Sequence, residues 1–455
     1  MGHHRPVATA AAHTLLVVLT ALLLALLLAP TAGAAAAPGT FLWRDIWNAK
    51  TPGVVANVHV TSAPTGDIYV ACSILRLVPD KYDVIVARYR PDGTRTWVRS
   101  WSRGVEVDEW VEGIAADPEG NLVVCGWFSG GRAGTPDWFV VKFDRGGDRL
   151  WTKTVAGIAG GDDRALDVVV NGAGRIYVAG SVARNAGGRD WRTAKLAPNG
   201  TTLWARSYAG PEGLDDLPSA MALDVDGNVY VTGFEGTVMQ TRRNLVTLSY
   251  AATGTRRWAR VLDVGREETG ADVAVRRSGV AIAGRTVDAA GVDHDSLAVR
   301  YTRAGALVSW STFNGPVAGA DHFSSAGIDG TGRSVFGGFM TNDLVNQRDA
   351  ELQWFEAGGA TGLHWGWAGD AARDDQVTDL HVAADGTLWA TGWIDTLLTG
   401  RDVMTWSSGW NAAYRWDDRW STMDKDIGDD LVVTSSAVYV AGRRGDDLLL
   451  LKYVR

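Results

Sequence analysis

Short hydrophobic runs, separated by polar links that contain glycine, follow one another from about residue 40 to the end of the chain. "NVYVTG" (228–233) is one such run, and "DVDG" (224–227) is the link before it. Runs rich in Val, Ile and Tyr are typical of β-strands, and tight links with glycine are typical of antiparallel hairpins because glycine adopts positive φ. No segment of this region sustains a helical periodicity. The pattern therefore predicts an all-β chain.

The runs recur with a fixed period. One marker ends the second run of each unit, and its positions, 50 to 54 residues apart, are Cys72, Gly126, Gly180, Gly233, Gly284, Gly338, Gly392 and Gly442. A second marker opens the third run, at Asp83, Asp137, Asp190, Asn244, Asp295, Asp349, Asp402 and Asp447. A third marker lies in the fourth run, at Trp43, Trp97, Trp151, Trp204, Trp258, Trp310, Trp365 and Trp416. Such a period indicates a repeat architecture.

Each unit contains four short strands joined by links such as "DPEG" (117–120) and "PNGT" (198–201). Four antiparallel strands at this period are typical of a β-propeller blade. We therefore predict an eight-bladed β-propeller of four-stranded antiparallel blades. A seven-bladed ring with one degenerate unit left over is the main alternative.

The two ends of the repeat complete each other. The last unit stops after its third run, "DLLLLKYV" (447–454), and the chain has a fourth run, "FLWRDIW" (41–47), without a unit of its own. We predict that residues 41–47 pair with residues 447–453 and close the ring, because closure removes an open sheet edge. Deletion of residues 38–48 should then destabilise the whole ring.

One stretch carries a resemblance to a known family. The segment "DWRTAKLAPNGTTLWARSYAGPEGLDDLPSAMALDVDGNVYVTG" (190–233) resembles the bacterial β-propeller repeat (SBBP) family, whose units combine a Lys-Tyr strand, a G-x-x-x-W phrase and a D-x-x-G-N-x-Y-V-x-G strand. The similarity extends over the region 38–455, although the sixth and seventh units have "QWF" and "WSS" in place of Lys-Tyr. The resemblance implies a propeller architecture and export, and no single activity.

The first residues predict export. Residues 1–37 have a weakly basic head, an apolar run over 15–29 and small residues at Ala32 and Ala34, which together are typical of a cleaved signal peptide. An uncleaved anchor is the alternative, but the run is short for a membrane span. We expect residues 38–455 to form a single propeller domain with no stable membrane span after cleavage. The expected location is secreted or extracellular, and the cell surface and the periplasm are the alternatives.

The charge and the cysteine content limit the classes of partner and the covalent cross-links that the chain can have. The 455 residues carry a formal net charge of −8 and no long basic run, which argues against nucleic acid. The only two cysteines, Cys72 and Cys125, exclude a disulfide framework, although one bridge stays open as an alternative to two buried thiols. The two cysteines lie in the second strands of neighbouring blades, one residue apart in register. We therefore expect their side chains to point to opposite faces of their sheets. We expect a monomer.

The repeated markers are interpreted as structural. A Trp at one fixed place in each blade should fill the layer between neighbouring blades. Five of the strand-three markers have Lys or Arg five residues later, at Arg88, Lys142, Lys195, Arg300 and Lys452. Such a pair lies on opposite faces of a strand, so it can form only across blades.

The links predict where binding residues gather. Because strands alternate in direction, the links into the first and third strands should emerge on one face, around the mouth of the central channel. An acidic series precedes the first strands, at Asp108, Asp162, Asp215, Glu267, Asp321, Asp375 and Asp424. Aromatic residues lie in or beside the same links, at Trp110, Trp127, Phe234, Phe339 and Trp393. Variable links on a rigid scaffold commonly bind ligands. We take these five aromatics, with Asp108, Asp162, Asp215, Asp321 and Asp375, as the candidate binding residues. The alternative is that the rings only cap the core.

The sequence predicts no catalytic residues, no metal site and no cofactor. Asp224 and Asp226 with Asn228 resemble the start of a calcium loop, but a strand follows, so a hairpin turn is the preferred interpretation and Ca²⁺ a weak alternative. The preferred function is an exported, non-catalytic binding or scaffold propeller whose acidic face engages an extracellular protein, a glycan or a cation. The alternative is an enzyme, either quinoprotein-like, although the adjacent cysteine pair of that family is absent, or carbohydrate-active through two carboxylates.

Overall fold

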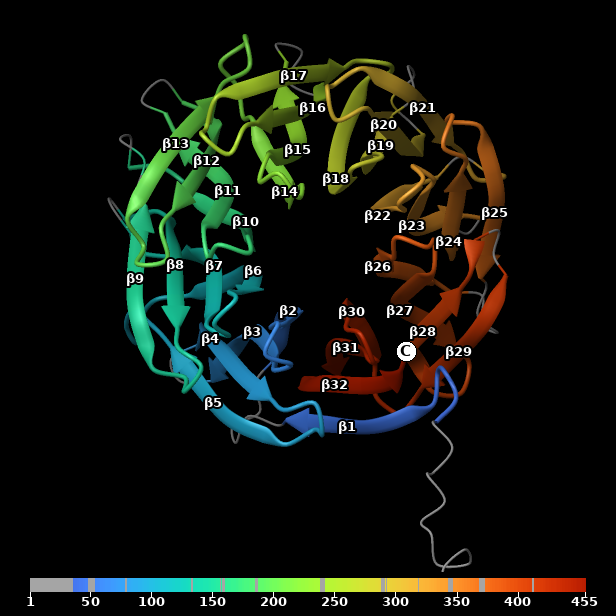
Figure 1. Ribbon diagram of the computed structural model, residues 1–455, viewed down its shortest axis with the longest axis horizontal. Coiled ribbons are helices and arrows are strands. Elements are labelled where there is room, and N and C mark those ends of the chain that lie inside the picture. The colour runs from blue at the N-terminus through green and yellow to red at the C-terminus, as the bar shows by residue number, and fades with distance from the viewer. Residues whose placement is uncertain are drawn as a thin grey trace, which may run out of the picture.

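The computed structural model describes residues 36–47, 54–77, 80–131, 134–155, 157, 160–184, 187–237, 242–287, 291, 293–317, 319–342, 347–367, 373–410 and 413–455. These residues form eight four-stranded antiparallel sheets arranged as the blades of a ring (Figure 1). The predicted eight-bladed β-propeller is therefore confirmed, and the seven-bladed alternative is wrong. The predicted signal peptide falls almost wholly on residues 1–35, which lie outside the described part of the chain.

Each blade is numbered by its order around the ring, and its strands run in chain order from the centre outward. Blade 1 comprises β2 (Val55–Ser62), β3 (Ile68–Leu77), β4 (Asp80–Tyr89) and β5 (Arg95–Trp101). Blade 2 comprises β6 (Glu109–Ala116), β7 (Leu122–Phe128), β8 (Asp137–Phe143) and β9 (Arg149–Val155). Blade 3 comprises β10 (Arg164–Val170), β11 (Ile176–Ala183), β12 (Arg189–Leu196) and β13 (Thr202–Tyr208). Blade 4 comprises β14 (Leu217–Leu223), β15 (Val229–Gly236), β16 (Arg243–Tyr250) and β17 (Arg256–Leu262).

The second half of the ring repeats this order. Blade 5 comprises β18 (Glu267–Arg276), β19 (Gly279–Val287), β20 (His294–Tyr301) and β21 (Leu307–Phe313). Blade 6 comprises β22 (His322–Ile328), β23 (Ser334–Thr341), β24 (Arg348–Phe355) and β25 (Thr361–Trp367). Blade 7 comprises β26 (Gln376–Val382), β27 (Leu388–Thr396), β28 (Gly400–Ser408) and β29 (Tyr414–Trp420). Blade 8 comprises β30 (Asp426–Val433), β31 (Ala437–Arg444), β32 (Asp447–Val454) and, as its outermost strand, β1 (Phe41–Trp47).

The ring is closed as the sequence predicts. β1 pairs antiparallel with β32, in a register that places Trp43 opposite Lys452 and Trp47 opposite Leu448. Two backbone bonds extend this pairing beyond the strands, from the Gly39 N–H to the Val454 carbonyl and from the Val454 N–H to the Thr40 carbonyl, both within 2.9 Å. In Figure 1 the blue β1 lies alongside the red β32. Both ends of the described chain therefore belong to one blade.

The core lies between the blades. Its buried apolar side chains fall into eight clusters, and each cluster joins two neighbouring blades, as when Ile68 and Val70 of blade 1 pack with Tyr439 and Leu450 of blade 8. Burial of apolar surface at every junction is the main favourable contribution to folding. Cys72 belongs to the cluster between blades 8 and 1, whereas Cys125 belongs to the cluster between blades 2 and 3. Because the two side chains enter different clusters, the predicted opposite orientation is confirmed. Both thiols are free, so the disulfide is not formed.

An outer lock reinforces the junctions. In five blades the indole N–H of the strand-four Trp donates to a backbone carbonyl in the last hairpin of the next blade: Trp43 to Pro91, Trp97 to Arg145, Trp151 to Pro198, Trp204 to Ala252 and Trp258 to Arg303. The glycine of that hairpin lies against the indole, and a Cβ on Gly254 would come within 2.8 Å of the Trp204 ring. Because Gly254 also has a φ of 86°, glycine is required there twice over.

The strand-three bases complete the lock, and their partners differ from the expected cross-blade carboxylates. Lys142 and Lys195 donate to the same carbonyls as the neighbouring Trp, at Pro198 (3.2 Å) and Ala252 (2.9 Å). Lys142 also forms an ion pair of 2.7 Å with Asp117, in the first hairpin of its own blade. The carbonyl that accepts both an indole N–H and an ammonium N–H is therefore tied twice to the preceding blade.

Two of the eight tryptophans do not follow the predicted pattern. Trp310 is displaced by one residue, because Ser309 lies opposite Arg300, in the position that Trp fills elsewhere. Trp310 is consequently 43 % exposed. Trp365 lies opposite Leu352, two residues from the regular position, so it stays on the face toward blade 7 and stacks on Trp406 of that blade, with ring centroids 4.6 Å apart. The prediction that the marker Trp fills the layer between blades is therefore wrong for Trp310, whereas Trp365 fills that layer from a shifted position.

Removal of β1 tests ring closure. A protein lacking residues 38–48 should unfold at a melting temperature lower by ten degrees or more, since β32 would become an open edge and the cluster around Trp43 would lose its outer wall. Circular dichroism against temperature measures the change. An unchanged melting temperature would show that the ring does not depend on β1.

One regular and one displaced tryptophan provide a matched comparison. Trp258→Ala should cost about 3–5 kcal/mol, because Trp258 is 7 % exposed and its N–H bonds to Arg303. Trp310→Ala should cost less than about 1 kcal/mol, because that ring is half in solvent. Denaturant midpoints of the two variants give the comparison, and equal losses would contradict the displacement of Trp310.

Candidate functional site: the loop face

Strand direction divides the ring into two faces. We call the face with the links between second and third strands, and between blades, the loop face. The opposite hairpin face carries the tight turns between first and second and between third and fourth strands. Backbone bonds link successive blades at the loop face, as from the Asp216 N–H of blade 4 to the Arg189 carbonyl of blade 3, at 2.7 Å. All ten candidate binding residues lie at or near this face, where the topology predicts them.

The half-buried members of the predicted acidic series each have a basic partner. Asp108 lies 3.3 Å from Lys81. Arg189 bridges Asp162 (3.2 Å) and Asp215 (2.8 Å), so one guanidinium serves two of the predicted carboxylates. The loop face is therefore a network of ion pairs rather than an uncompensated ring of negative charge.

Asp321 and Asp375 are of a different kind, because they are buried and bind backbone amides. Asp321 accepts hydrogen bonds from the Gly315 N–H and the Thr341 N–H, both at 2.6 Å, and Asp375 accepts one from the Asp395 N–H at 2.6 Å. Burial raises the pKa of Asp321, and the two amide donors only partly oppose this shift. These carboxylates fasten the incoming link to the ends of the first two strands.

The same position in other blades is the residue after the one that the sequence indicated. Glu109, Asp163 and Asp216 are fully buried and bind backbone amides of the link before them, whereas the predicted Asp108, Asp162 and Asp215 stay at the surface. Burial raises the pKa of Glu109 to about 7 and that of Asp216 to about 6. The buried position was missed because two acidic residues stand side by side in each of these links. The distance to the marker glycine was the available signal, because the second residue of each pair lies as far before its glycine as Asp321 lies before Gly338.

An arginine covers four of the five predicted aromatics. The guanidinium carbon lies over the ring at 4.4 Å for Arg164 on Trp127, 4.4 Å for Arg243 on Phe234, 4.5 Å for Arg348 on Phe339 and 3.9 Å for Arg401 on Trp393. Such cation–π contacts hold the guanidinium in place while its edge faces solvent. We call these four pairs the arginine–aromatic pairs. One face of each ring is thus covered by a guanidinium group.

Trp110 lies within an aromatic stack. Its ring is 4.1 Å from Tyr82 of blade 1 and 5.7 Å from Trp127, to which it is nearly parallel at 16°. The Trp127 indole N–H donates to Glu112 at 2.9 Å. Tyr82, Trp110, Trp127 and Arg164 therefore form one continuous stack across the first three blades.

Sequence reasoning missed the arginines, although a signal was present. Arg243, Arg348 and Arg401 each directly precede the strand-three marker, as does Arg189. At that place the side chain reaches the aromatic residue that follows the marker glycine on the paired strand. A recurring Arg before the marker, read together with a recurring aromatic after the glycine, would have indicated the pairs.

One hollow on this face combines the two kinds of residue. It has a volume of 440 Å³ between blades 3 and 4, and Arg189, Asp215, Phe234 and Arg243 contribute to its wall. Arg243 also forms an ion pair of 3.0 Å with Glu267. The wall presents aromatic and guanidinium surface held by neighbouring carboxylates, a combination suited to recognition by contact.

A second set of acidic residues surrounds the axis of the ring, and the sequence analysis missed it. Asp167, Asp272, Asp379 and Asp430 follow a β-bulge in their first strands, and each accepts a hydrogen bond from a backbone N–H of the next blade at 2.7 to 3.0 Å. Burial raises the pKa of Asp167 to about 7 and that of Asp272 to about 6. Burial and the nearby Asp379 raise the pKa of Asp430 well above its ordinary value. We call this set the axial belt.

The segment that resembles the start of a calcium loop is a hairpin turn, which is the interpretation that the sequence favoured. It joins β14 to β15, and the Asp224 carboxylate accepts from the Asp226 and Asn228 N–H groups. Both Asp224 and Asp226 pair with Arg303 of the next blade. Among the described residues, no group of three or more His, Cys, Asp or Glu is arranged to hold a metal ion.

The axial belt predicts a pH dependence of stability. A carboxyl whose pKa is raised on folding binds more protons in the native state, so it stabilises the fold at low pH and this contribution is lost as the pH rises through the folded pKa. Asp430→Asn should therefore raise stability by roughly 1–2 kcal/mol at pH 8 and change little at pH 5. Thermal unfolding at the two pH values measures this effect. Asp148→Asn, in an exposed hairpin, is the control, and equal effects of Asp430→Asn at both pH values would contradict the prediction.

Comparison with known proteins adds the following. Residues 174–202 match the model described as a domain of unknown function (DUF5122) beta-propeller. No curated protein sequence matches the chain. Among solved structures, the chain is similar to the beta-propeller domain of the Trilobed protease from Pyrococcus furiosus, with 8 % identity over 90 % of this chain and 94 % of that one and a TM-score of 0.44. It is also similar to the Dos1 propeller, with 10 % identity over 91 % and 94 % and a TM-score of 0.41.

A further similar structure is the Pyrococcus horikoshii acylaminoacyl peptidase, with 8 % identity over 86 % of this chain and 58 % of the peptidase and a TM-score of 0.44. The matched family model supports a β-propeller family, and the specific SBBP repeat stays an inference from the sequence. In the described part of the chain, no helix is long and apolar enough to cross a membrane.

Proposed function

We propose that the chain is an exported, non-catalytic binding propeller that engages a partner protein through its loop face. The observation that carries this proposal is the set of arginine–aromatic pairs. Arg, Trp and Tyr dominate the binding energy of protein interfaces, since large rings and planar guanidinium groups contribute area and directed hydrogen bonds together.

Rigidity supports the same proposal. Each guanidinium is held by the ring beneath it, and three are held by carboxylates as well: Arg164 by Asp162 and Arg243 by Glu267, both at 3.0 Å, and Arg401 by Asp395 at 3.8 Å. A side chain fixed before binding loses less conformational entropy on association. The closed ring holds the pairs at set distances from one another, so the face suits a partner of fixed shape.

The acidic residues of the loop face take a supporting role in this proposal. Asp162, Asp215 and Glu267 orient the arginines, and a partner contact would use the remaining guanidinium N–H groups. The proposed ligand is thus a protein with carboxylate or carbonyl groups at its contact surface. Export rests on residues 1–37 and on the family resemblance, and it is part of the proposal.

Two arginines of blade 4 provide the test, the half-buried Arg243 and the exposed Arg256. Arg243 opens β16 on the loop face, and Arg256 opens β17 on the hairpin face. The protein with residues 38–455 is incubated with secreted proteins of its source, cross-linked, and the cross-linked peptides are identified by mass spectrometry. We expect cross-links at the loop face that Arg243→Ala reduces about tenfold and Arg256→Ala leaves unchanged.

Two outcomes would contradict the proposal. Cross-links gathered on the hairpin face would show that the wrong surface was chosen. Saturable binding to a glycan array, lost in Phe234→Ala and without a protein cross-link, would replace the partner protein by a sugar.

A further inference from the structure

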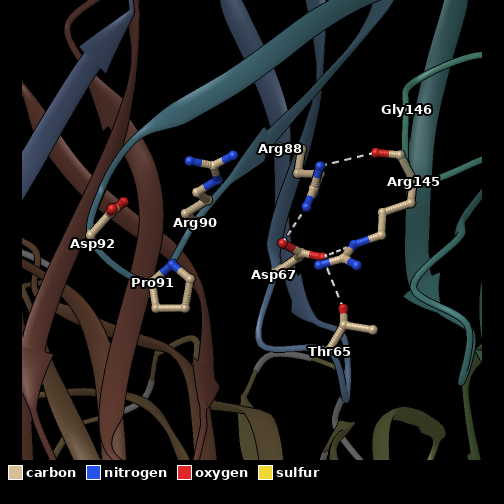
Figure 2. A pocket seen from close by; sticks show the side chains of 8 residues that line it. All are labelled: Thr65, Asp67, Arg88, Arg90, Pro91, Asp92, Arg145 and Gly146. Atoms are coloured by element: carbon tan, nitrogen blue, oxygen red, sulfur yellow. Dashed lines mark hydrogen bonds and ion pairs between the residues drawn. The ribbon is translucent and has the colours of Figure 1, made fainter.

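A charged groove lies on the hairpin face, between blades 1 and 2. Its volume is 740 Å³, and three arginines from three different segments reach it: Arg88 from β4, Arg90 from the hairpin after β4, and Arg145 from the last hairpin of blade 2. Figure 2 shows Asp67 at its centre, between Arg88 and Arg145. The groove is on the face opposite the arginine–aromatic pairs and is independent of them.

Asp67 fixes two of the three arginines. One carboxylate oxygen accepts from Arg88 at 2.6 Å, and the other accepts from Arg145 at 2.6 Å and from the Thr65 hydroxyl at 2.8 Å. Asp67 is 2 % exposed. Its burial raises the pKa, but the hydrogen bonds from Arg145 and Arg88 outweigh this effect and hold the pKa below its usual range. The carboxylate is therefore ionised near neutral pH, and both guanidinium groups are positioned before any ligand arrives.

Positive charge exceeds negative charge in the groove. Arg88 and Arg145 share the single carboxylate of Asp67, and Arg90 is exposed and makes no side-chain hydrogen bond or ion pair with the residues that the structure describes. Asp92 is the second acid of the wall, and its carboxylate accepts from the Thr94 N–H at 2.8 Å. Figure 2 shows the Arg90 guanidinium across the groove from Arg145 and not joined to Asp92. Three guanidinium groups thus face two carboxylates.

The corresponding junction of blades 4 and 5 shows what a satisfied arrangement looks like. Arg303 occupies the position of Arg145, since the carbonyl of each accepts the indole N–H of the preceding blade's Trp at 3.0 Å. Arg303 pairs with two carboxylates, those of Asp224 and Asp226. Arg145 shares the single carboxylate of Asp67 with Arg88. The same scaffold position therefore carries a balanced cluster in one place and an electropositive one in the other.

We propose that this groove binds an oxyanion of the phosphate or sulfate type, either free or as the charged group of a larger molecule. Planar guanidinium groups bind such oxygens through paired N–H donors, and Arg is the preferred residue for this recognition. Arg90 and the outer N–H groups of Arg145 supply the donors. The volume exceeds that of a bare ion and falls in the range of small-molecule sites, so there is room for a sugar or similar body beside the charged group.

Titration calorimetry at low ionic strength tests the proposal. The probes are inorganic phosphate, inorganic sulfate, glucose 6-phosphate and, as the uncharged control, glucose. We expect saturable binding of the charged probes and none of glucose. Tighter binding of glucose 6-phosphate than of inorganic phosphate assigns the site to a substituted oxyanion, and the reverse order assigns it to the free ion.

Two variants localise the binding. Arg90→Gln should weaken phosphate binding about tenfold or more, because it removes one charge-assisted donor. Arg256→Gln removes the same charge from an exposed position on the same face of blade 4, and it should leave the affinity unchanged. Both side chains are exposed, so both variants should keep the wild-type melting temperature. Equal loss in the two variants would reduce the effect to general surface charge and overturn the proposal, as would the absence of saturable binding by any charged probe.

Discussion

The structure depends on one repeated contact, in which a carbonyl of a blade's last hairpin accepts an indole N–H, and in several blades also an ammonium or guanidinium N–H, from the blade before it. The hairpin that offers the carbonyl needs glycine, because the indole occupies the space of a Cβ. Residues of different blades thus require one another, and the requirement passes from blade to blade over five successive junctions, from blade 8 to blade 5. Burial between blades contributes most of the energy, while this contact sets how each blade is oriented on the next.

The repeat was predictable because the contact imprints itself on the sequence. Trp, the hairpin glycine and the strand-three base recur with the period of the blade, and together they were sufficient to predict four strands per unit, eight units and the pairing of β1 with β32. The period fails where the contact is replaced. In blade 5, Arg300 bonds to the carbonyl oxygens of Glu356 and Ala357, and Trp310 is released to the surface. The displacement of Trp310 by one residue leaves no mark in the sequence, because Ser309, the residue in the regular position, gives no signal of its own.

The site was less predictable, because charge patterns do not reveal their partners. A series of acidic residues indicated a negative face, but Arg189 lies between two of them and Arg243 beside a third. Which of two adjacent acids is buried, as for Asp162 and Asp163, depends on a register of one residue. The axial belt escaped notice for a further reason: a β-bulge precedes each of its members, and the bulge is a backbone feature without a sequence marker of its own. The groove at Asp67 likewise requires knowing that Arg145 of another blade reaches it.

The position of β1 has a consequence for how the ring assembles. Seven blades are continuous in the chain, so each can form from neighbouring segments as soon as they are available. The eighth joins the earliest described strand to the last one, and contacts between segments so distant form slowly because the long intervening loop must be closed first. Until β32 is present, Trp43 has no strand to pair with and the cluster it covers stays open to solvent. Closure of the ring is therefore a late event, and chains interrupted before Asp447 leave β1 without its partner strand and prone to aggregate.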